Sequence, residues 1–198
     1  KKKNAEDFEK RPAAALHLCY VGNLGEAYDI RTVIEGVRAL TEEGEAVTLK
    51  VAGDGPQRAL VLEAIESGLP ITYCGYLKQE ELQDCLDGCD VGVVPMFASS
   101  WVAVPNKVAD YAAAGLAMVN GLEGETQAFL ERYEAGMLYE AGDVRSFVSA
   151  VRRYSKDRLL LAQHRQGARR LAEEEFDAAG IYPAMAKWIE GVTGKRGP

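Results

Sequence analysis

The sequence predicts one α/β domain with a Rossmann-like, doubly wound parallel sheet of about six strands, helices on both faces and a C-terminal helical tail. Three observations support this fold class. Short apolar runs of strand length alternate with longer amphipathic segments along almost the whole chain. The short runs are apolar nearly throughout, as expected for parallel strands covered on both faces. The 198 residues suit a single domain, and neither an internal repeat nor a domain linker divides them.

Six short apolar runs are predicted to be the strands: residues 15–21, 47–52, 71–74, 91–94, 116–119 and 137–139. The first run ends at Gly22 and the second at the turn Gly53–Pro56, and such residues are typical where a strand stops. Connections between parallel strands are right-handed, so a helix after each strand favours the doubly wound arrangement.

The amphipathic segments predict helices at residues 30–40, 60–65, 80–86, 107–114 and 126–133 and, after an N-cap at Asp143, onward through 159–176. Pro56 is placed in the first turn of the second helix, where its missing N–H costs nothing. A break near Ala179-Gly180 precedes a final helix with Met185 and Trp188. We therefore divide the chain into a disordered or linker lead-in (1–14), a Rossmann-like domain (15–176) and a C-terminal helix and tail (177–198).

The net charge of −7 argues against nucleic acid as the main partner, because phosphate backbones are held by an excess of Lys and Arg. A small phosphate ligand remains compatible with this charge, since a few local donors can hold it. No apolar run approaches the ~20 residues that span a bilayer, and there is no signal-peptide pattern. The opening segment, Lys1–Asp7, is expected to be an arbitrary point within a longer polypeptide.

The four cysteines lie in or beside apolar stretches without a Cys-x-x-Cys spacing; they are Cys19, Cys74, Cys85 and Cys89. Cys85 and Cys89 would share one face of a helix, which leaves a metal-binding pair as one interpretation. The spacing favours the other interpretation, reduced and buried thiols of a cytosolic protein.

In an open parallel sheet, ligands bind at the carboxyl ends of the strands where the strand order reverses, so the loop after each strand is a candidate site. In the first loop, Gly22–Gly25, two glycines allow close approach to a ligand. The helix that follows offers unpaired N–H groups to an anion. A tight strand–helix turn explains these residues equally well. In the second loop, Gly53–Pro56, a turn into a helix explains every residue.

The loop after the fourth strand, residues 96–104, is unusually apolar and includes Ser99, Ser100 and Trp101. Pro105 can start the next helix and Asn106 can serve as an early polar cap. Lys107 then places a cation beside the positive end of that helix, which is unfavourable for the helix itself. A positive charge in this unfavourable position indicates that an anion binds at the start of the helix.

Asp110 lies one helical turn after Lys107 and would share its face. A carboxylate there could accept hydrogen bonds from vicinal sugar hydroxyls. The alternative is an ordinary Lys–Asp pair at i, i+3. In the fifth loop, Asn120–Thr126, glycines again precede a helix start that polar groups can cap. His17 and His164 have no partner pattern, and the sequence contains no Ser/His/Asp arrangement, paired-carboxylate signature or metal-ligand cluster.

Taken in order, the motifs resemble the C-terminal domain of GT-B fold glycosyltransferases of the large retaining family 4 (group 1), especially bacterial surface-polysaccharide members. The resemblance runs from about residue 16 to 176. The motifs are Tyr-Val-Gly-Asn-Leu-Gly (20–25), Leu-Lys-Val-Ala-Gly-Asp-Gly-Pro (49–56), Ile-Thr-Tyr-Cys-Gly (71–75), Asp-Val-Gly-Val-Val-Pro (90–95), Pro-Asn-Lys-Val-Ala-Asp-Tyr-Ala-Ala-Ala-Gly (105–115) and Gly-Met-Leu-Tyr-Glu-Ala-Gly-Asp (136–143).

This resemblance implies roles for the matched positions. The loop Gly22–Gly25 would lie beside the donor diphosphate, and Gly75–Leu77 would hold the base, largely through backbone groups. Asp110 aligns with the second acid of the family's Glu-x7-Glu motif, which holds the ribose hydroxyls. A phosphate contact at Lys107 is our own inference from its place in the motif. The predicted substrate-binding residues are Gly22, Asn23, Gly25, Gly75, Tyr76, Leu77, Lys107, Asp110, Glu125 and Thr126.

Two departures from the family pattern are present. The first acid of Glu-x7-Glu falls at Val102, and the usual Arg and Lys after the first strand are absent, with Asn23 and Asp29 in that region. A sub-group with a Pro-Asn-Lys-x-x-Asp-Tyr pattern is similar in both respects.

The resemblance implies the donor-binding half of an enzyme that moves a sugar from a nucleoside-diphosphate sugar with retention of configuration, in surface polysaccharide or glycoconjugate synthesis. It implies neither a metal nor a cofactor. It also implies a missing N-terminal acceptor domain that supplies the catalytic residues, so that the isolated domain is inactive. The parent enzyme would be cytoplasmic, with peripheral association at the inner face of the membrane left open.

Three alternatives remain. A GT-B epimerase of nucleotide sugars would be expected to have more carboxylates in its donor loops. A dinucleotide-dependent oxidoreductase would need the full glycine fingerprint, which is absent. A non-catalytic α/β ligand-binding module would leave Lys107 and Asp110 without a ligand.

Overall fold

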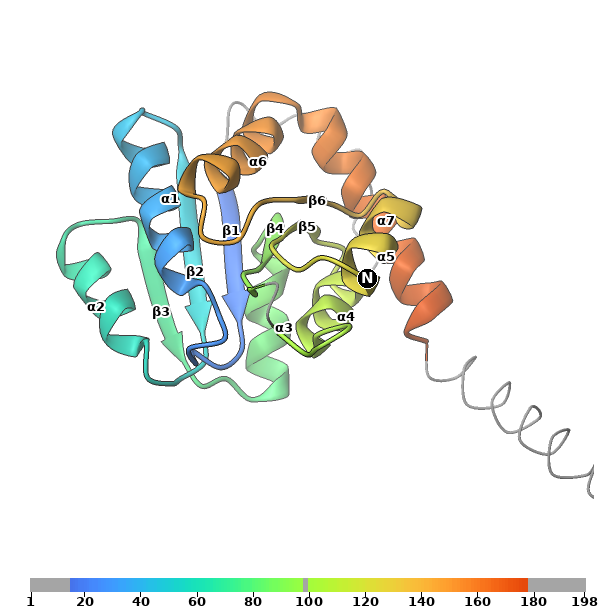
Figure 1. Cartoon of the computed structure of the whole chain (residues 1–198), viewed down its shortest axis with the longest axis horizontal. Coiled ribbons are helices and arrows are strands. Elements are labelled where there is room, and N and C mark those ends of the chain that lie inside the picture. The colour runs from blue at the N-terminus through green and yellow to red at the C-terminus, as the bar shows by residue number, and fades with distance from the viewer. Residues whose placement is uncertain (1–14, 98–99, 178–198) are drawn as a thin grey trace, which may run out of the picture.

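The computed structural model describes residues 15–97 and 100–177, and it has the predicted fold class, a Rossmann-like parallel sheet between layers of helices (Figure 1). The strands are β1 (Leu16–Val21), β2 (Val47–Ala52), β3 (Ile71–Gly75), β4 (Val91–Val94), β5 (Ala117–Asn120) and β6 (Gly136–Leu138). The helices are α1 (Ile30–Glu42), α2 (Arg58–Glu66), α3 (Gln79–Asp87), α4 (Asn106–Ala113), α5 (Glu125–Tyr133), α6 (Val144–Lys156) and α7 (Arg158–Glu175). The strand order is β3-β2-β1-β4-β5-β6, and every pairing is parallel.

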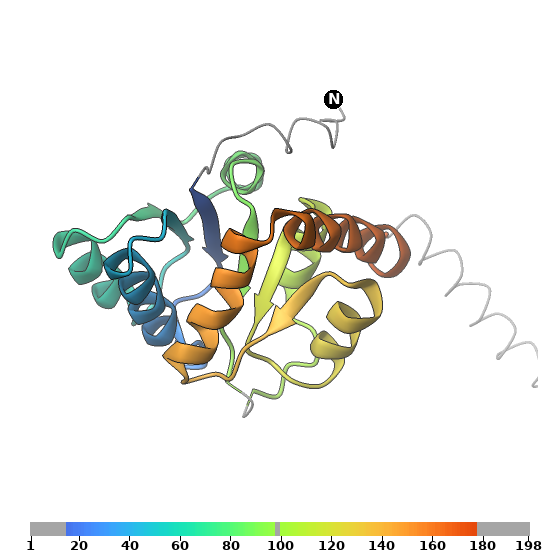
Figure 2. The same cartoon turned by 90° about the horizontal axis from the view of Figure 1, so that it is seen from above.

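Helices cover both faces of this sheet (Figure 2). An apolar core lies on each face. Side chains alternate along a strand, so Leu18 and Tyr20 of β1 enter one core and Cys19 enters the other. The first core lies under α1, α2 and α6, and the second lies under α3 and α4. Helix α7 contributes to both, through Leu161 and Leu171 respectively. The strands are therefore covered on both faces, which explains their nearly continuous apolar composition.

Several local expectations need correction. Helix α2 begins at Arg58 with Gln57 as its N-cap, so Pro56 lies in the turn before the helix. Asn106 is the first residue of α4 and does not cap it; Pro105 holds the N-cap position. In contrast, the predicted N-cap of α6 is confirmed, because the Asp143 carboxylate accepts hydrogen bonds from two backbone N–H groups of its first turn.

The predictions for residues 1–14, and for the break and final helix after residue 177, lie outside the described residues. Ser99 also lies outside them. Among the helices that are described, none is long and apolar enough to cross a membrane.

The strand order reverses between β1 and β4, and there the two strands separate. They pair only at Leu18–Val91 and Cys19–Gly92. Beyond this point Tyr111 of α4 bridges the gap: the Val21 N–H donates to its hydroxyl at 2.8 Å, and the hydroxyl donates to the Val93 carbonyl at 3.2 Å. A Cβ atom on Gly92 would lie only 2.3 Å from the Tyr111 ring, so the glycine makes room for it. The carboxyl ends of β1 and β4 are thus held apart, as required for a crevice at a switch point.

Candidate donor-binding site

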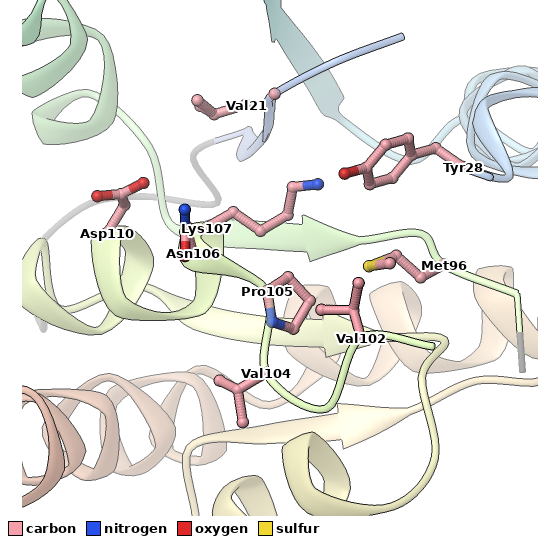
Figure 3. Close-up of a pocket in the computed structure, with 10 residues that line it drawn as sticks. Val21, Tyr28, Met96, Val102, Val104, Pro105, Asn106, Lys107 and Asp110 are labelled. Carbon is pink, nitrogen blue, oxygen red and sulfur yellow. The ribbon is translucent and has the colours of Figure 1, made fainter. Parts of the chain in front are cut away.

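A cavity of about 430 Å³ lies at this switch point (Figure 3). Its walls come from the end of β1, the loop after β1, the loop after β4 and the start of α4. The lining residues are Val21, Gly22, Tyr28, Met96, Val102, Val104, Pro105, Asn106, Lys107 and Asp110. The cavity therefore occupies the position where open parallel sheets bind their ligands.

The loop after β1 is held in place by the loop after β2. The Leu24 N–H donates to the Asp54 carbonyl at 2.9 Å, and the Gln57 N–H donates to the Leu24 carbonyl at 2.9 Å. A Cβ atom at Gly53 would lie 1.8 Å from the Gly22 carbonyl oxygen, so only glycine allows this approach. The loop Gly53–Pro56, which the sequence explained as a turn into a helix, therefore also supports one wall of the cavity.

The start of α1 does not offer the open N–H groups that the sequence suggested. Asp29 is only 4% exposed and caps the helix by accepting a hydrogen bond from the Thr32 N–H at 3.3 Å. Its other carboxylate oxygen accepts from the Gly142 N–H at 2.6 Å. A protein carboxylate thus occupies the position at the helix start that an anionic ligand would need.

The two loops at the switch point are joined to each other. Tyr28 and Met96 form an isolated antiparallel bridge, and the Asp29 N–H donates to the Pro95 carbonyl at 2.7 Å. This connection brings the Tyr28 ring across the cavity to the side chain of Lys107 (Figure 3).

Lys107 is 6% exposed, although it carries an ammonium group. Its Nζ lies 3.9 Å from the centroid of the Tyr28 ring and 4.8 Å from that of Tyr20. No carboxylate within the described part of the chain lies within ion-pair distance of it. Burial lowers the pKa of Lys107 to about 7, and the charge of Asp110 opposes this shift only in part. The cation–π contacts stabilise the ammonium modestly, so an anion in the cavity would be a favourable partner.

Gly22 adjoins this ammonium. A Cβ atom there would lie 3.2 Å from Lys107 Nζ, and Gly22 has a φ of +137° that side chains rarely adopt. The start of α4 beside it carries no side-chain cap, because Pro105 occupies the N-cap position. The cavity thus combines an ammonium with an uncapped helix start, and both favour an anion.

Asp110 lies on the same helix but does not pair with Lys107. Figure 3 shows the Lys107 side chain extending toward Tyr28, with the Asp110 carboxyl on the far side of the helix start. The residue is exposed overall, yet partial enclosure raises the pKa of its carboxyl, and Lys107 opposes that shift. The expected alternative of an i, i+3 ion pair is therefore absent, and the carboxyl is accessible at the edge of the cavity.

Residues 15–157 match the family described as Glycosyl transferases group 1. The chain belongs to this family. The resemblance drawn from the six sequence motifs is thereby confirmed.

Two curated relatives illustrate the match. The chain is 25% identical over 190 residues to WcaL of Escherichia coli K12, whose name assigns it provisionally to colanic acid biosynthesis as a glycosyltransferase; the match covers 92% of this chain and 47% of that protein. It is 29% identical over 189 residues to the 2-deoxystreptamine glucosyltransferase of Streptomyces kanamyceticus, with 89% and 46% covered. The chain thus spans about half the length of the curated relatives it matches.

Solved structures show the same fold. HepE of Anabaena, solved in complex with UDP, superposes with a TM-score of 0.75 at 16% identity, over 89% of this chain and 49% of HepE. WaaG, described as a glycosyltransferase involved in lipopolysaccharide biosynthesis, superposes with a TM-score of 0.72 at 15% identity, over 98% of this chain and 52% of WaaG.

In this group 1 glycosyltransferase chain, three of the ten predicted contact residues line the cavity: Gly22, Lys107 and Asp110. Asn23 and Gly25 lie in the adjoining loop after β1. Gly75–Leu77 lie at the end of β3, where the Gly75 carbonyl accepts a hydrogen bond from the Gly53 N–H at 2.7 Å. Their backbone is therefore on the same edge of the sheet as the cavity but outside it.

Glu125 and Thr126 lie at the start of α5, also outside the cavity. The Thr126 hydroxyl is fully buried and donates to the Ala103 carbonyl at 2.7 Å. It braces the loop after β4 in this way, while Glu125 is exposed.

Sequence reasoning missed Tyr28 and Met96 as cavity residues. Their antiparallel bridge joins two loops 68 positions apart (96 − 28 = 68), and no local pattern marks such a contact. Val102, noted only as a departure from the Glu-x7-Glu motif, also lines the cavity. Among the described residues, no group of three or more His, Cys, Asp or Glu side chains is placed to hold a metal ion.

Proposed function

We propose that this chain binds the donor of a glycosyltransferase, a nucleoside-diphosphate sugar, with the diphosphate against Lys107 and the start of α4. The observation that carries the proposal is a buried ammonium inside the switch-point cavity without a carboxylate partner in the described chain. An anionic ligand is the partner that would stabilise such a group. Membership of the family supports a sugar nucleotide, and the UDP complex of HepE supports a nucleoside diphosphate.

Along the sheet edge, consecutive close contacts between glycines support an extended pose for this donor. Gly75 contacts Gly53 through a hydrogen bond, and Gly53 approaches the Gly22 carbonyl so closely that no side chain fits between them. We place the base at Gly75–Leu77 and the diphosphate beside the loop Gly22–Gly25, including Asn23. Asp110 then accepts hydrogen bonds from the ribose hydroxyls.

On the far side of the cavity, the exposed Glu125 is the proposed contact from α5. Thr126 contributes through the loop that its hydroxyl braces at Ala103. This pose uses the whole carboxyl edge of the sheet from β3 to β5.

The chemical role of the site is to stabilise the departing diphosphate as the bond to the sugar breaks. The Lys107 ammonium and the N–H groups at the start of α4 face the position where negative charge grows. The transfer would proceed with retention of configuration. Acceptor-side residues would come from a further domain, because the chain spans about half the length of its curated relatives. We expect the 198 residues alone to bind the donor and not to transfer the sugar.

Synthesis of a surface polysaccharide or glycoconjugate is the proposed pathway class. It is supported by the names of relatives in colanic acid and amylovoran biosynthesis. We place the enzyme in the cytoplasm, with peripheral association at the inner face of the membrane as part of the proposal.

Calorimetric titration with UDP, GDP and ADP tests the donor site. We expect saturable binding of at least one nucleotide, and a loss of tenfold or more in affinity in Lys107→Met, about 1.4 kcal/mol. Lys156→Met is the matched control, because Lys156 is exposed and pairs with Glu45 on the surface, away from the cavity. Absence of binding by all three nucleotides, or equal affinity in Lys107→Met and the wild type, would contradict the proposal.

A further inference from the structure

The lining of the donor cavity differs in chemistry from one side to the other. Helix α4 brings an amide, an ammonium and a carboxyl group to it, from Asn106, Lys107 and Asp110. The loop after β4 and the N-cap of α4 bring only side chains made of carbon and, in one case, sulfur. These residues form the apolar wall: Met96, Val102, Val104 and Pro105. A ligand in the cavity therefore meets hydrogen-bonding side chains on one side and an apolar surface on the other.

Backbone groups of the apolar wall are already engaged within the protein. The Pro105 carbonyl accepts from the Val108 N–H at 2.9 Å, and a proline has no N–H of its own to donate. The Ala103 carbonyl accepts from the Thr126 hydroxyl at 2.7 Å. A ligand hydroxyl turned toward this wall would exchange water for carbon atoms, and the loss of its hydrogen bonds weakens binding.

The position of the donor sugar follows from the proposed function, on which this inference rests. In that pose the ribose lies at Asp110 and the diphosphate at Lys107. Figure 3 shows Asp110 on one side of the Lys107 side chain, with Met96 and Val102 on the other. The sugar is bonded to the phosphate farther from the ribose, so it continues past Lys107 toward Met96 and Val102. One side of the sugar then contacts the apolar wall.

We propose that the donor sugar is a 6-deoxyhexose, whose methyl group packs against Met96 and Val102. In an ordinary hexose the same carbon carries a hydroxyl, for which the apolar wall has no hydrogen-bonding side chain. A methyl group needs no such partner. It would also cover Val102, which is 43% exposed in this chain, and the burial of apolar surface favours binding.

An N-acetylated sugar also ends in a methyl group, but it fits this wall less well. Its acetamido group adds an N–H donor and a carbonyl acceptor beside that methyl. Both would need hydrogen-bond partners, which the side chains of the apolar wall lack. The wall therefore favours a 6-deoxyhexose over both the ordinary hexose and its N-acetylated form.

Calorimetric titration of the 198-residue chain with matched donors tests this specificity. The donors are UDP-glucose, UDP-6-deoxyglucose and UDP-N-acetylglucosamine, with the corresponding GDP or ADP series if that nucleotide binds better. A single methyl or hydroxyl group in an apolar pocket changes affinity by about 10- to 200-fold. Because the wall is partly open to solvent at Val102, we expect the lower end, about tenfold tighter binding of the 6-deoxy donor than of the glucose donor. The N-acetylated donor should bind no better than the glucose donor.

Two matched variants assign the preference to the wall. Val102→Thr supplies the missing hydrogen-bonding group, because threonine has the shape of valine with a hydroxyl in place of one methyl. The ratio of the two affinities should then fall toward one. Val144→Thr makes the same change at the first residue of α6, outside the cavity, and should keep the tenfold preference.

Three outcomes would overturn the proposed sugar specificity. They are equal affinity for the glucose and 6-deoxyglucose donors, tighter binding of the glucose or N-acetylated donor, and an unchanged tenfold preference in Val102→Thr. In each of them the nucleotide still binds, so the proposed donor site itself would stand. If no nucleotide or donor binds, the donor site is wrong and the sugar specificity falls with it.

Discussion

Two helix starts face the switch point, and they differ in what occupies them. At α1, the buried carboxylate of Asp29 caps the helix and also binds the Gly142 N–H. At α4, Pro105 leaves the start without a side-chain cap, and the ammonium of Lys107 lies beside it. In sequence, both starts follow a strand and a small-residue loop, so both suggested an anion site. The protein therefore supplies its own anion at the start of α1 and places none at the start of α4.

The largest expected effect comes from opening the start of α1. Asp29→Ala removes the cap on Thr32 and leaves the Gly142 N–H without its acceptor, so we expect a loss of about 2–4 kcal/mol in the free energy of unfolding. Asp143→Ala, which removes only the cap of α6, should cost about 1 kcal/mol. Urea unfolding measures both, and equal losses in the two variants would show that the Gly142 contact contributes nothing.

The pH dependence of donor affinity probes the start of α4. The pKa of Lys107 is about 7, below its ordinary value of 10.5, and a bound diphosphate would raise it by favouring the charged form. Donor affinity should therefore be greatest below pH 7 and fall by up to about tenfold per pH unit above it. Calorimetry with a nucleoside-diphosphate sugar measures this directly, because its diphosphate does not titrate in that range. An affinity that stays constant from pH 6 to 9 would contradict the assignment of Lys107.

Folding stability should also depend on the protonation of Lys107. It should rise with pH, whereas donor affinity falls. The unfolded chain holds a proton on Lys107 up to about pH 10.5 and the folded chain only to about pH 7, so the unfolded state binds more protons in that window. The contribution of Lys107 to stability therefore rises with pH between those values. Lys107→Met should remove this contribution, and at pH 6 it should stabilise the domain by about 1–2 kcal/mol while weakening nucleotide binding. If Lys107→Met is less stable than the wild type at pH 6, burial of the Lys107 ammonium has no net cost to folding stability.

The smallest expected effect comes from giving α4 the cap that α1 already has. Pro105→Asp places a carboxylate at the N-cap position, which should stabilise the helix by about 0.5–1 kcal/mol. The same carboxylate would compete with the ligand for Lys107, so UDP affinity should fall several-fold. Pro105→Ala controls for the loss of the proline ring. Equal UDP affinity in the two variants would show that a carboxylate at position 105 does not compete with the ligand.

Most of the fold was predictable because its causes are local. Strands covered on both faces must be apolar throughout, and a helix on a core must repeat apolar residues, as Ile30, Val33 and Val37 do in α1. The largest local error, at Pro56, arose because a proline fits both the first turn of a helix and the turn before it.

The candidate site was predictable only in part. Gly22 and Lys107 were found because the switch-point rule selects loops, and loops are visible in a sequence. The capping of α1 was not found, because Asp29 binds a residue 113 positions away (142 − 29 = 113). The buried Thr126 hydroxyl was likewise invisible, since its acceptor is a carbonyl on another loop. Such contacts depend on tertiary structure and leave no local periodicity.

A crystal structure of the chain with bound UDP would test the proposed diphosphate position directly. We expect the diphosphate to lie within hydrogen-bond distance of Lys107 Nζ and of the backbone N–H groups at the start of α4, with Asp29 still capping α1. A diphosphate bound at the start of α1, or anywhere that leaves the Lys107 ammonium without a phosphate contact, would contradict it.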